Sequence, residues 1–245
     1  MTDDREAATR LNKHIAESGF CSRREADRLI AARRVTVNGL AAGMGAVVGE
    51  GDEVQVDGQA LRVRQKKPGG RRHVYIMLNK PVGITCTTES AVDGNIVDFV
   101  DHQERIFPIG RLDKESEGLI LLTSNGDIVN EILRAENRHE KEYHVAVNKP
   151  VTDEFLRGMA RGVRIHNQTT LPCKTSKLAK FGFRIILTQG LNRQIRLMSD
   201  AFDYRVKQLR RVRIDNLKLG ALKPGQWRNL TEVELRGLLP QRTEW

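Results

Sequence analysis

One short stretch does most to limit what this chain can fold into. Residues 62–72, RVRQKKPGGRR, contain six basic residues, a proline and two glycines, with no acidic residue and almost no apolar side chain. Such a stretch cannot join a packed core, so we expect an interdomain linker, either a solvated connector or one that also follows phosphates. The 245 residues then divide into a small module, 8–61, and a larger domain, 73–242, each long enough to bury its own core.

The N-terminal module begins with two predicted helices. In the first, Leu11 and Ile15 stand four residues apart, which places them on one face, and Gly19 can end the helix. Ser22 precedes the second helix, and Glu25 follows three residues later, the spacing of a capping box. The segments VTVNGL and GDEVQVDGQ then predict short strands with tight turns. We therefore expect a compact unit of helices followed by strands.

Basic residues crowd the start of the second helix of this module. Arg23 and Arg24 stand where free backbone N–H groups and guanidinium forks suit a phosphate backbone. The same arginines could instead form surface ion pairs with Glu17, Glu25 and Asp27. The run RLNKHIAESGFCSRREADRLIAARRVTVNG resembles the alpha-L RNA-binding module of a small-subunit ribosomal protein and of several RNA-modifying enzymes. The resemblance implies RNA contacts by a set of basic and polar residues: Arg10, Lys13, Ser22, Arg23, Arg24, Arg33 and Asn38.

The overall charge agrees with a polyanionic partner. The chain has 41 Lys and Arg against 31 Asp and Glu, a net charge of +10. No run of about 18 apolar residues is present and the N-terminus is acidic and polar, so we expect no membrane association. Three separated cysteines, Cys21, Cys86 and Cys173, are typical of reduced thiols. These features favour a cytoplasmic protein.

The larger domain mixes strands and helices without regular alternation. VYIMLNKP, GLILLTSNG, EYHVAVNKP and FRIILTQG are apolar or β-branched runs that end in turn residues. Helical patterns occur in DIVNEILR, TDEFLRGMARG, NRQIRLMSDAFD and TEVELRGLL, the last behind a capping box from Thr231 to Glu234. Because strands do not alternate with long helices, we expect an α+β fold.

Several kinds of chemistry lack their motifs in this sequence. No G-x-x-x-x-G-K-[ST] is present, no G-x-G-x-x-G follows a strand, and no H-x-E accompanies a C-x-x-C that could hold a deaminase zinc. His139 and His144, five residues apart, would point to opposite faces of one strand, so we expect them at the surface rather than on a metal. We expect no metal and no cofactor.

The most informative segment is FPIGRLDKESEGLILLTSNGD, residues 107–127. Gly110 permits a close backbone approach just before Arg111 and Asp113, and the polar KESEG stretch leads into an apolar strand that anchors it. This arrangement is typical of a loop held in an active site. By itself, however, R-L-D is a common tripeptide, and a carboxylate beside an arginine is usually a structural ion pair.

Two further motifs follow this segment in the sequence, and the three together resemble a known family. GRLDKESEGLILLTSNGD resembles the catalytic motif of the RsuA-type pseudouridine synthases, and KEYHV and GLNRQIRLM follow as that family's later motifs. With the alpha-L module the resemblance covers nearly the whole chain, and it implies a mixed, mainly antiparallel catalytic sheet. Two departures stand out: Leu197 replaces an expected basic residue, and Ser116 stands where many relatives carry Thr. The first puts RNA affinity or site choice in doubt.

The resemblance implies a role for each of three residues in isomerising uridine. The reaction breaks the bond from uracil to ribose, turns the base and rejoins it through carbon five, so one carboxylate can suffice. Asp113 is that group by resemblance, either attacking covalently or removing a ribose proton. Arg196 would pair with Asp113, keeping it ionised and aimed. Tyr143 would stack on the uracil, unless it is simply a half-buried strand residue.

Further residues are expected to hold the RNA around this centre. A base must leave the stack before it can react, and Arg111 is the candidate for filling the vacated space, with a salt bridge as its alternative role. Asn192 and Arg193 belong to the third motif. The basic run RVKQLRRVR, residues 205–213, predicts an RNA path that includes Arg210 and Arg211, with Leu209 packed beneath the catalytic loop.

The substrate is less constrained than the reaction. NIVDFV after KPVGI, and RAENRHEKEY, are most similar to enzymes that modify large-subunit ribosomal RNA, so we expect 23S rRNA as partner, with a tRNA anticodon-loop uridine as a further candidate. The alternatives are 16S rRNA, a non-catalytic ribosome-assembly protein, and an RNA methyltransferase, which would need a glycine-rich turn that this sequence lacks. With no extended apolar surface stripe, we expect a monomer.

Overall fold

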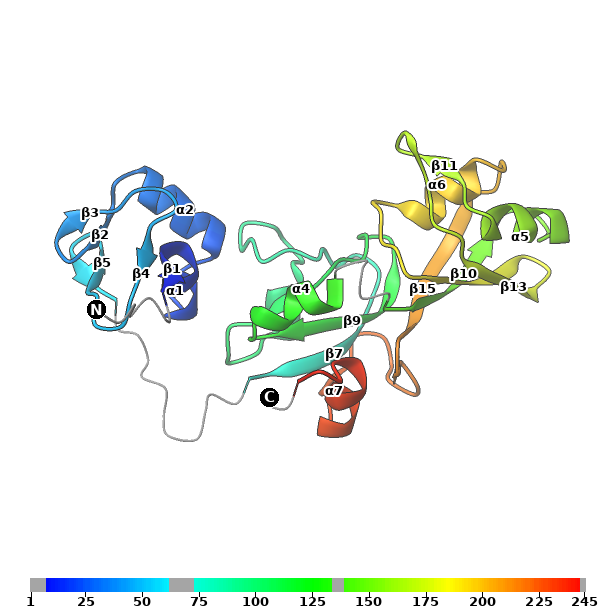
Figure 1. Ribbon diagram of the computed structural model, residues 1–245. Helices are drawn as coiled ribbons and strands as arrows, with labels where there is room; N and C mark the ends of the chain where they lie inside the picture. Colours follow the sequence, from blue (N-terminus) through cyan, green and yellow to red (C-terminus); the bar gives the residue numbers. More distant parts are fainter. Residues whose placement is uncertain (1–7, 62–72, 134–138, 243–245) are drawn as a thin grey trace. The chain divides into compact units, whose positions relative to one another are not determined.

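The computed structural model describes residues 8–61, 73–133 and 139–242, and the chain divides into two compact units, residues 1–71 and 72–245 (Figure 1). The predicted linker, residues 62–72, lies outside the described residues, as do residues 134–138 of the RAENRHEKEY segment. Each unit has its own apolar core. Among the described residues the longest helix has nine residues, and none is long and apolar enough to cross a membrane.

The first unit packs two helices against short strands. Its elements are β1 (Thr9–Arg10), α1 (Leu11–Glu17), α2 (Arg23–Ala31), β2 (Val35–Val37), β3 (Leu40–Ala41), β4 (Val47–Val48), β5 (Val54–Val56) and β6 (Gln59–Ala60). Four of the strands form an antiparallel sheet in the order β3-β2-β5-β6, and β1 pairs with β4. Leu11 and Ile15 of α1 are fully buried in the core, as the four-residue spacing predicts. The helices-then-strands prediction is confirmed.

The second unit is built on a nine-stranded sheet. Its strands are β7 (Tyr75–Lys80), β8 (Phe107–Ile109), β9 (Glu117–Thr123), β10 (Lys141–Val147), β13 (Lys174–Ala179), β14 (Gly182–Leu187), β15 (Val206–Ile214), β16 (Leu217–Lys218) and β17 (Trp227–Asn229). The order is β13-β14-β10-β15-β9-β7-β17, with β16 beside β15 and β8 beside β9. Among the described strand pairs of this sheet, β15 with β9 alone is parallel. The α+β class with a mixed, mainly antiparallel sheet is confirmed.

Helices cover different faces of this sheet. They are α3 (Ile96–Val100), α4 (Asp127–Leu133), α5 (Asp153–Ala160), α6 (Gln194–Asp200) and α7 (Glu232–Leu238), and a small hairpin joins β11 (Arg164–Ile165) to β12 (Gln168–Thr169). One core holds residues of α5 and α6, and the other holds residues of α4 and α7. Strand β7 feeds both, Ile76 and Leu78 into the first and Tyr75 and Met77 into the second, which explains its unbroken apolar run.

The central strand β15 was not predicted as a strand from the sequence. The run RVKQLRRVR suggested an RNA path, yet its residues pair with β10 on one side and β9 on the other. At the second contact Gly118 has φ +108°, and a Cβ there would lie 2.2 Å from the carbonyl oxygen of Arg211. Only glycine allows this close parallel approach. Gly118, the glycine after KESE, therefore lets the predicted catalytic loop, residues 110–116, lead into the middle of the sheet.

Candidate active site

The loop that carries Asp113 lies between β8 and β9 and is tied down by its neighbours. The backbone N–H of Ser116 donates to the Asp113 carbonyl at 3.0 Å, which closes a turn. The N–H of Gly83 donates to the Lys114 carbonyl at 2.8 Å, and the N–H of Leu112 donates to the Cys86 sulfur at 3.4 Å. Gly110 enters the loop with φ +76°. These bonds hold the backbone of the loop, and the Asp113 side chain is left 28% exposed and open to a ligand.

Arg196 of α6 lies beside this carboxylate with an incomplete set of bonds. Its Nη atoms donate to the Val206 and Glu115 carbonyls, each at 3.4 Å, and to the Ser116 hydroxyl at 3.2 Å. Its Nε lies 3.8 Å from Asp113 Oδ2, beyond hydrogen-bond distance, and is buried without a partner among the described residues. A buried N–H without a partner costs free energy, so Arg196 Nε retains an unused hydrogen bond beside Asp113.

Arg193 approaches the same oxygen from the start of α6. Its Nη1 lies 3.9 Å from Asp113 Oδ2 and donates to Glu115 at 2.7 Å. The bond from Arg193 lowers the pKa of Glu115 below its ordinary range, and the same bond raises the pKa of Arg193. Arg193 holds φ +50° and is 42% exposed, so its guanidinium stands at the mouth of the site. The catalytic loop thus meets one buried and one exposed arginine.

Lys80, at the end of β7, was missed by sequence reasoning. Its side chain is fully buried, and Nζ donates to the Pro81 carbonyl at 2.9 Å and the Ile84 carbonyl at 2.8 Å. Burial lowers the pKa of Lys80, while the charges of Cys86, Asp113 and Glu117 oppose that shift. The ammonium therefore fixes the turn at 81–84 and adds positive potential at Asp113. A lysine that ends a buried, mainly apolar strand was the signal that could have revealed it.

Tyr143 is placed by the sheet register. It lies opposite Arg211 of β15, and Arg211 in turn lies opposite Gly118 of β9. The Tyr143 side chain belongs to the same apolar cluster as Leu112 and Leu209. Arg211 Cζ lies 6.0 Å from the centroid of the tyrosine ring. The fold therefore brings the tyrosine strand and the catalytic loop to one core, with the phenol largely buried.

Arg211 requires a correction, because its side chain does not lie on a solvent path. It is 4% exposed, and its Nε donates to the Leu119 carbonyl at 2.6 Å. Strand alternation turns Arg211 toward the core beside Gly118, where it contacts Tyr143, so it is a structural support rather than an RNA contact. The neighbouring Arg210 is half-buried and lies opposite Glu117. Leu209 is buried in the core, as expected.

Two further predicted substrate residues, Arg111 and Asn192, are exposed. Arg111 is exposed and makes no ion pair within the described part of the chain, so the salt-bridge alternative receives no support. Asn192 is exposed, and its carbonyl contacts Nε2 of His166 at 3.0 Å. Ser116 is fully buried against Arg196, and Leu197 packs on the main core. His139, expected at the surface, is instead largely buried against Asp215.

The first unit divides its predicted RNA residues into exposed and engaged groups. Arg10, Arg23, Arg24 and Arg33 are exposed. The acids that could have neutralised Arg23 and Arg24 contact other side chains: Glu25 pairs with Arg28 at 3.0 Å, Glu17 with Lys13 at 3.5 Å, and Asp27 accepts from Asn12 at 2.9 Å. Because Glu25 pairs with Arg28, the capping box is replaced by a single Ser22 cap at 3.1 Å. The Asn38 amide bonds to Asp52 and Glu53, a structural role.

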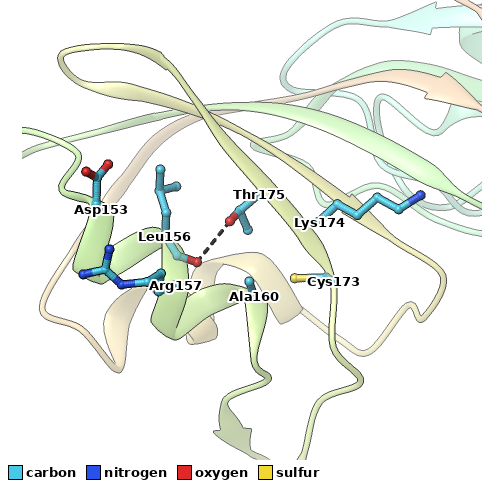
Figure 2. Close-up of a pocket in the computed structure, with 7 residues that line it drawn as sticks. All are labelled: Asp153, Leu156, Arg157, Ala160, Cys173, Lys174 and Thr175. Carbon is cyan, nitrogen blue, oxygen red and sulfur yellow. Dashed lines mark hydrogen bonds between the residues drawn. The ribbon is translucent and has the colours of Figure 1, made fainter.

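An open groove elsewhere in the second unit holds none of the predicted site residues. It has a volume of about 550 Å³ and lies between α5 and the start of β13, where the Thr175 hydroxyl donates to the Leu156 carbonyl at 3.0 Å (Figure 2). Burial raises the pKa of the Cys173 thiol to about 11, so it stays protonated at neutral pH. Among the described residues no cluster of His, Cys, Asp or Glu has the arrangement of a metal site.

The two units together point to one class, an enzyme that modifies RNA: a small module of helices and strands precedes a mixed sheet that carries the Asp113 loop. The RNA pseudouridylate synthase family matches residues 74–201, and the S4 domain matches residues 9–54. The chain is 56% identical over 230 residues to "Dual-specificity RNA pseudouridine synthase RluF" of Escherichia coli strain CFT073, covering 94% of this chain and 78% of that protein.

Two further comparisons agree. The chain is 33% identical to "Ribosomal large subunit pseudouridine synthase B" of Bacillus subtilis, covering 94% of this chain and 95% of that protein. A crystal structure of a pseudouridylate synthase superposes with a TM-score of 0.68 at 28% identity, covering 94% of this chain and 99% of that one. The chain belongs to the RNA pseudouridylate synthase family, and it is a pseudouridine synthase with an S4 domain at its N-terminus.

Proposed function

We propose that this enzyme isomerises a uridine of 23S rRNA and that Asp113 is its essential carboxylate. The observation that carries the catalytic assignment is the unpartnered Nε of Arg196, held 3.8 Å from Asp113 Oδ2. When a uridine enters and displaces water, a closure of about 1 Å would turn this contact into a charge-assisted hydrogen bond. Asp113 would then be aimed at the ribose, either at carbon one or at the proton on carbon two.

Tyr143 and Arg111 take complementary places in this proposal. The uracil ring would stack against Tyr143, whose strand leads past the catalytic loop, and such stacking contributes roughly 1 to 3 kcal/mol. Extruding the base costs a few kcal/mol, and the exposed Arg111 guanidinium is free to enter the vacated space. Asn192 and Arg193 would contact the flanking ribose and phosphate, and Arg210 the strand beyond them.

The S4 domain would supply affinity for structured RNA. Arg23 and Arg24 stand at the N-terminus of α2 with their neighbouring acids engaged elsewhere, so their guanidinium groups are available to phosphates. Arg10, Lys13 and Arg33 would extend the contact, and Ser22 would act by fixing the helix start. Asn38 would act by fixing the turn. Neutralising Arg23 and Arg24 should weaken binding and flatten its salt dependence.

The substrate assignment rests on the relatives. One relative is named for the ribosomal large subunit and the more similar one for dual specificity, so we propose 23S rRNA first and a tRNA anticodon-loop uridine second. We further propose that the enzyme acts as a cytoplasmic monomer, which light scattering of the purified chain with and without RNA would test. Modification of 16S rRNA is the competing outcome.

The deciding experiment maps pseudouridine by carbodiimide treatment and primer extension in 23S rRNA, 16S rRNA and tRNA. Cells lacking the protein are complemented by the parent, by Asp113→Asn or by Asp93→Asn, a control at an exposed acid outside the loop. We expect a stop in 23S rRNA that the parent and the control restore and Asp113→Asn does not, although Asp113→Asn folds and binds RNA normally. Restoration by Asp113→Asn would overturn the catalytic assignment, and a stop confined to 16S rRNA would overturn the substrate.

A further inference from the structure

Three segments form a basic and apolar edge at the end of the sheet near α5 (Figure 1), and we call them the hairpin rim. They are the turn between β13 and β14, residues 177–182; the segment after β10, residues 147–151; and the segment that starts β15, residues 204–208. Together they contain five basic residues and no acidic residue: Lys149, Lys177, Lys180, Arg205 and Lys207. The acids that flank them in sequence are Asp153 and Asp203.

Backbone hydrogen bonds hold the three segments together. The N–H of Val147 donates to the Phe181 carbonyl at 2.9 Å, and the N–H of Val151 donates to the Lys180 carbonyl at 2.7 Å. The N–H of Asn148 donates to the Arg205 carbonyl at 3.1 Å, and the N–H of Arg205 donates to the Asn148 side chain at 2.6 Å. The rim is thus a fixed surface, so a ligand need not order it first.

Apolar side chains project between these cations. Leu178 is 50% exposed and Phe181 is 45% exposed. The Lys180 ammonium lies 5.5 Å from the centroid of the Phe181 ring. An exposed ring beside a lysine combines a surface on which a base can stack with a charge that can hold a neighbouring phosphate. A protein partner could use the apolar part, but the excess of cations over acids favours a polyanion.

The rim is continuous with the catalytic loop. Arg196, next to Asp113, donates to the carbonyl of Val206 inside the rim. Gln208 donates at 2.6 Å to Glu117, the residue after Ser116, and Gln208, Ala146, Gly182 and Ala179 stand side by side on four neighbouring strands. Three strand spacings amount to about 15 Å, or about four nucleotides of a stacked strand. An RNA strand leaving the catalytic loop can reach Phe181.

We propose that the hairpin rim is a second RNA-binding surface, which holds the strand flanking the target nucleotide by phosphate contacts to Lys177 and Lys180 and by stacking of one base on Phe181. The proposal rests on the proposed function, because it takes RNA in the catalytic loop as its starting point. It assigns the rim to affinity and site choice, since the ion pairs of Asp113 are with Arg193 and Arg196, which lie outside the rim.

The test measures binding of the full chain to a 23S rRNA transcript across a salt series. Lys177→Gln with Lys180→Gln should weaken binding roughly tenfold near physiological salt and reduce the slope of log affinity against log salt by about 1.4. The matched control is Lys218→Gln with Lys223→Gln, which removes two exposed lysines outside the rim and should change affinity less than twofold. Parental affinity and slope in the Lys177 and Lys180 variant would overturn the proposal.

A second measurement addresses the ring. Ultraviolet cross-linking of the parent to the same transcript, followed by mass spectrometry, should find a nucleotide on the peptide that carries Phe181, and Phe181→Leu should lose that adduct while remaining folded. Absence of the adduct in the parent would overturn the stacking contact. Both measurements read binding alone, so they separate failure of the rim from failure of the proposed reaction, which would show as a missing pseudouridine stop.

Discussion

Two regions of the second unit pair arginine with carboxylates in opposite ways. On the sheet face away from the main core, Arg213 donates to Glu140 at 2.9 Å and to Glu142 at 2.8 Å, and Lys174 reaches Glu140 at 2.8 Å. At the catalytic loop, Asp113 lies 3.8 and 3.9 Å from its two arginines, and Arg196 Nε has no partner in the described part of the chain. In the first region the charged groups form short ion pairs. In the second region Asp113 and Arg196 lie beyond hydrogen-bond distance of each other.

The difference teaches how to tell a structural charge from a functional one. Short, complete ion pairs mainly hold β-strands in place. Removing one partner leaves the other charge partly buried and unpaired, which lowers stability. Incomplete pairing around a directed carboxylate costs stability in the free enzyme and becomes favourable when a ligand completes it. Residue type alone does not separate the two regions, because both consist of basic side chains beside carboxylates.

Arg196→Lys should produce the largest effect and tests the second region, at the catalytic loop, directly. A lysine keeps the charge but cannot bond Val206, Glu115 and Ser116 while also facing Asp113, so turnover should fall roughly a hundredfold. Single-turnover kinetics on the mapped RNA would measure this, with RNA affinity as the control reading. If turnover stays within threefold of the parent, the long contact to Asp113 is structural and the comparison fails.

Arg213→Gln should have a large effect on stability and almost none on turnover. It removes bonds to Glu140, Glu142 and the Asp215 carbonyl from a side chain that is 18% exposed, so unfolding free energy should fall by about 2 kcal/mol. Thermal unfolding should then shift down by about 5 °C. Arg236→Gln is the matched control, because its pair with Glu232 is exposed and should contribute under about 0.5 kcal/mol. A hundredfold loss of turnover in Arg213→Gln would mean that Arg213 also serves catalysis and that the two regions do not differ in function.

Sequence patterns identified the elements whose apolar periodicity is strong. The four apolar runs are β7, β9, β10 and β14, and the four helical patterns are α4 to α7, with the Thr231 and Glu234 capping box formed as predicted. These succeed because burial and capping act within a few residues of the chain. The parts of the candidate site that lie close together in sequence, Asp113 with Ser116 and Arg193 with Arg196, share this advantage.

The failures come from residues whose role depends on distant strands. The run 205–213, which overlaps strand β15, holds five basic residues in nine positions, a composition that favours a surface. The burial of the strand depends on contacts from β9 and β10. Arg211 is buried only because Gly118 admits its backbone. The buried ammonium of Lys80 donates to two backbone carbonyls of a turn that sequence patterns do not place. Local patterns cannot report such long-range contacts.

Glu140 supplies a pH test of the first region, with its short ion pairs. Hydrogen bonds from Lys174 and Arg213 lower the pKa of Glu140 in the folded protein below its unfolded value of about 4.3. The stability that this carboxylate contributes is therefore present above about pH 4.3 and is lost as the pH falls through its folded pKa. Urea unfolding should show Glu140→Gln about 1 kcal/mol less stable than the parent at pH 7 and converging with it toward pH 3. A constant difference across that range would contradict the assignment.

Glu115→Gln should have the smallest effect. It tests the difference between the two regions within the catalytic loop itself, because Glu115 is the acid of that loop with a short ion pair, to Arg193. Removing its charge releases Arg193 from the 2.7 Å contact and also removes a negative charge from the mouth of the site. We expect RNA binding to tighten two- to fivefold and its salt slope to steepen by about 0.7, the signature of one added phosphate contact. Glu154→Gln, an exposed acid on α5, should leave the slope unchanged. Equal shifts in both variants would mean that the change in net charge is responsible. The ion pair between Glu115 and Arg193 would then not limit the contact of Arg193 with RNA.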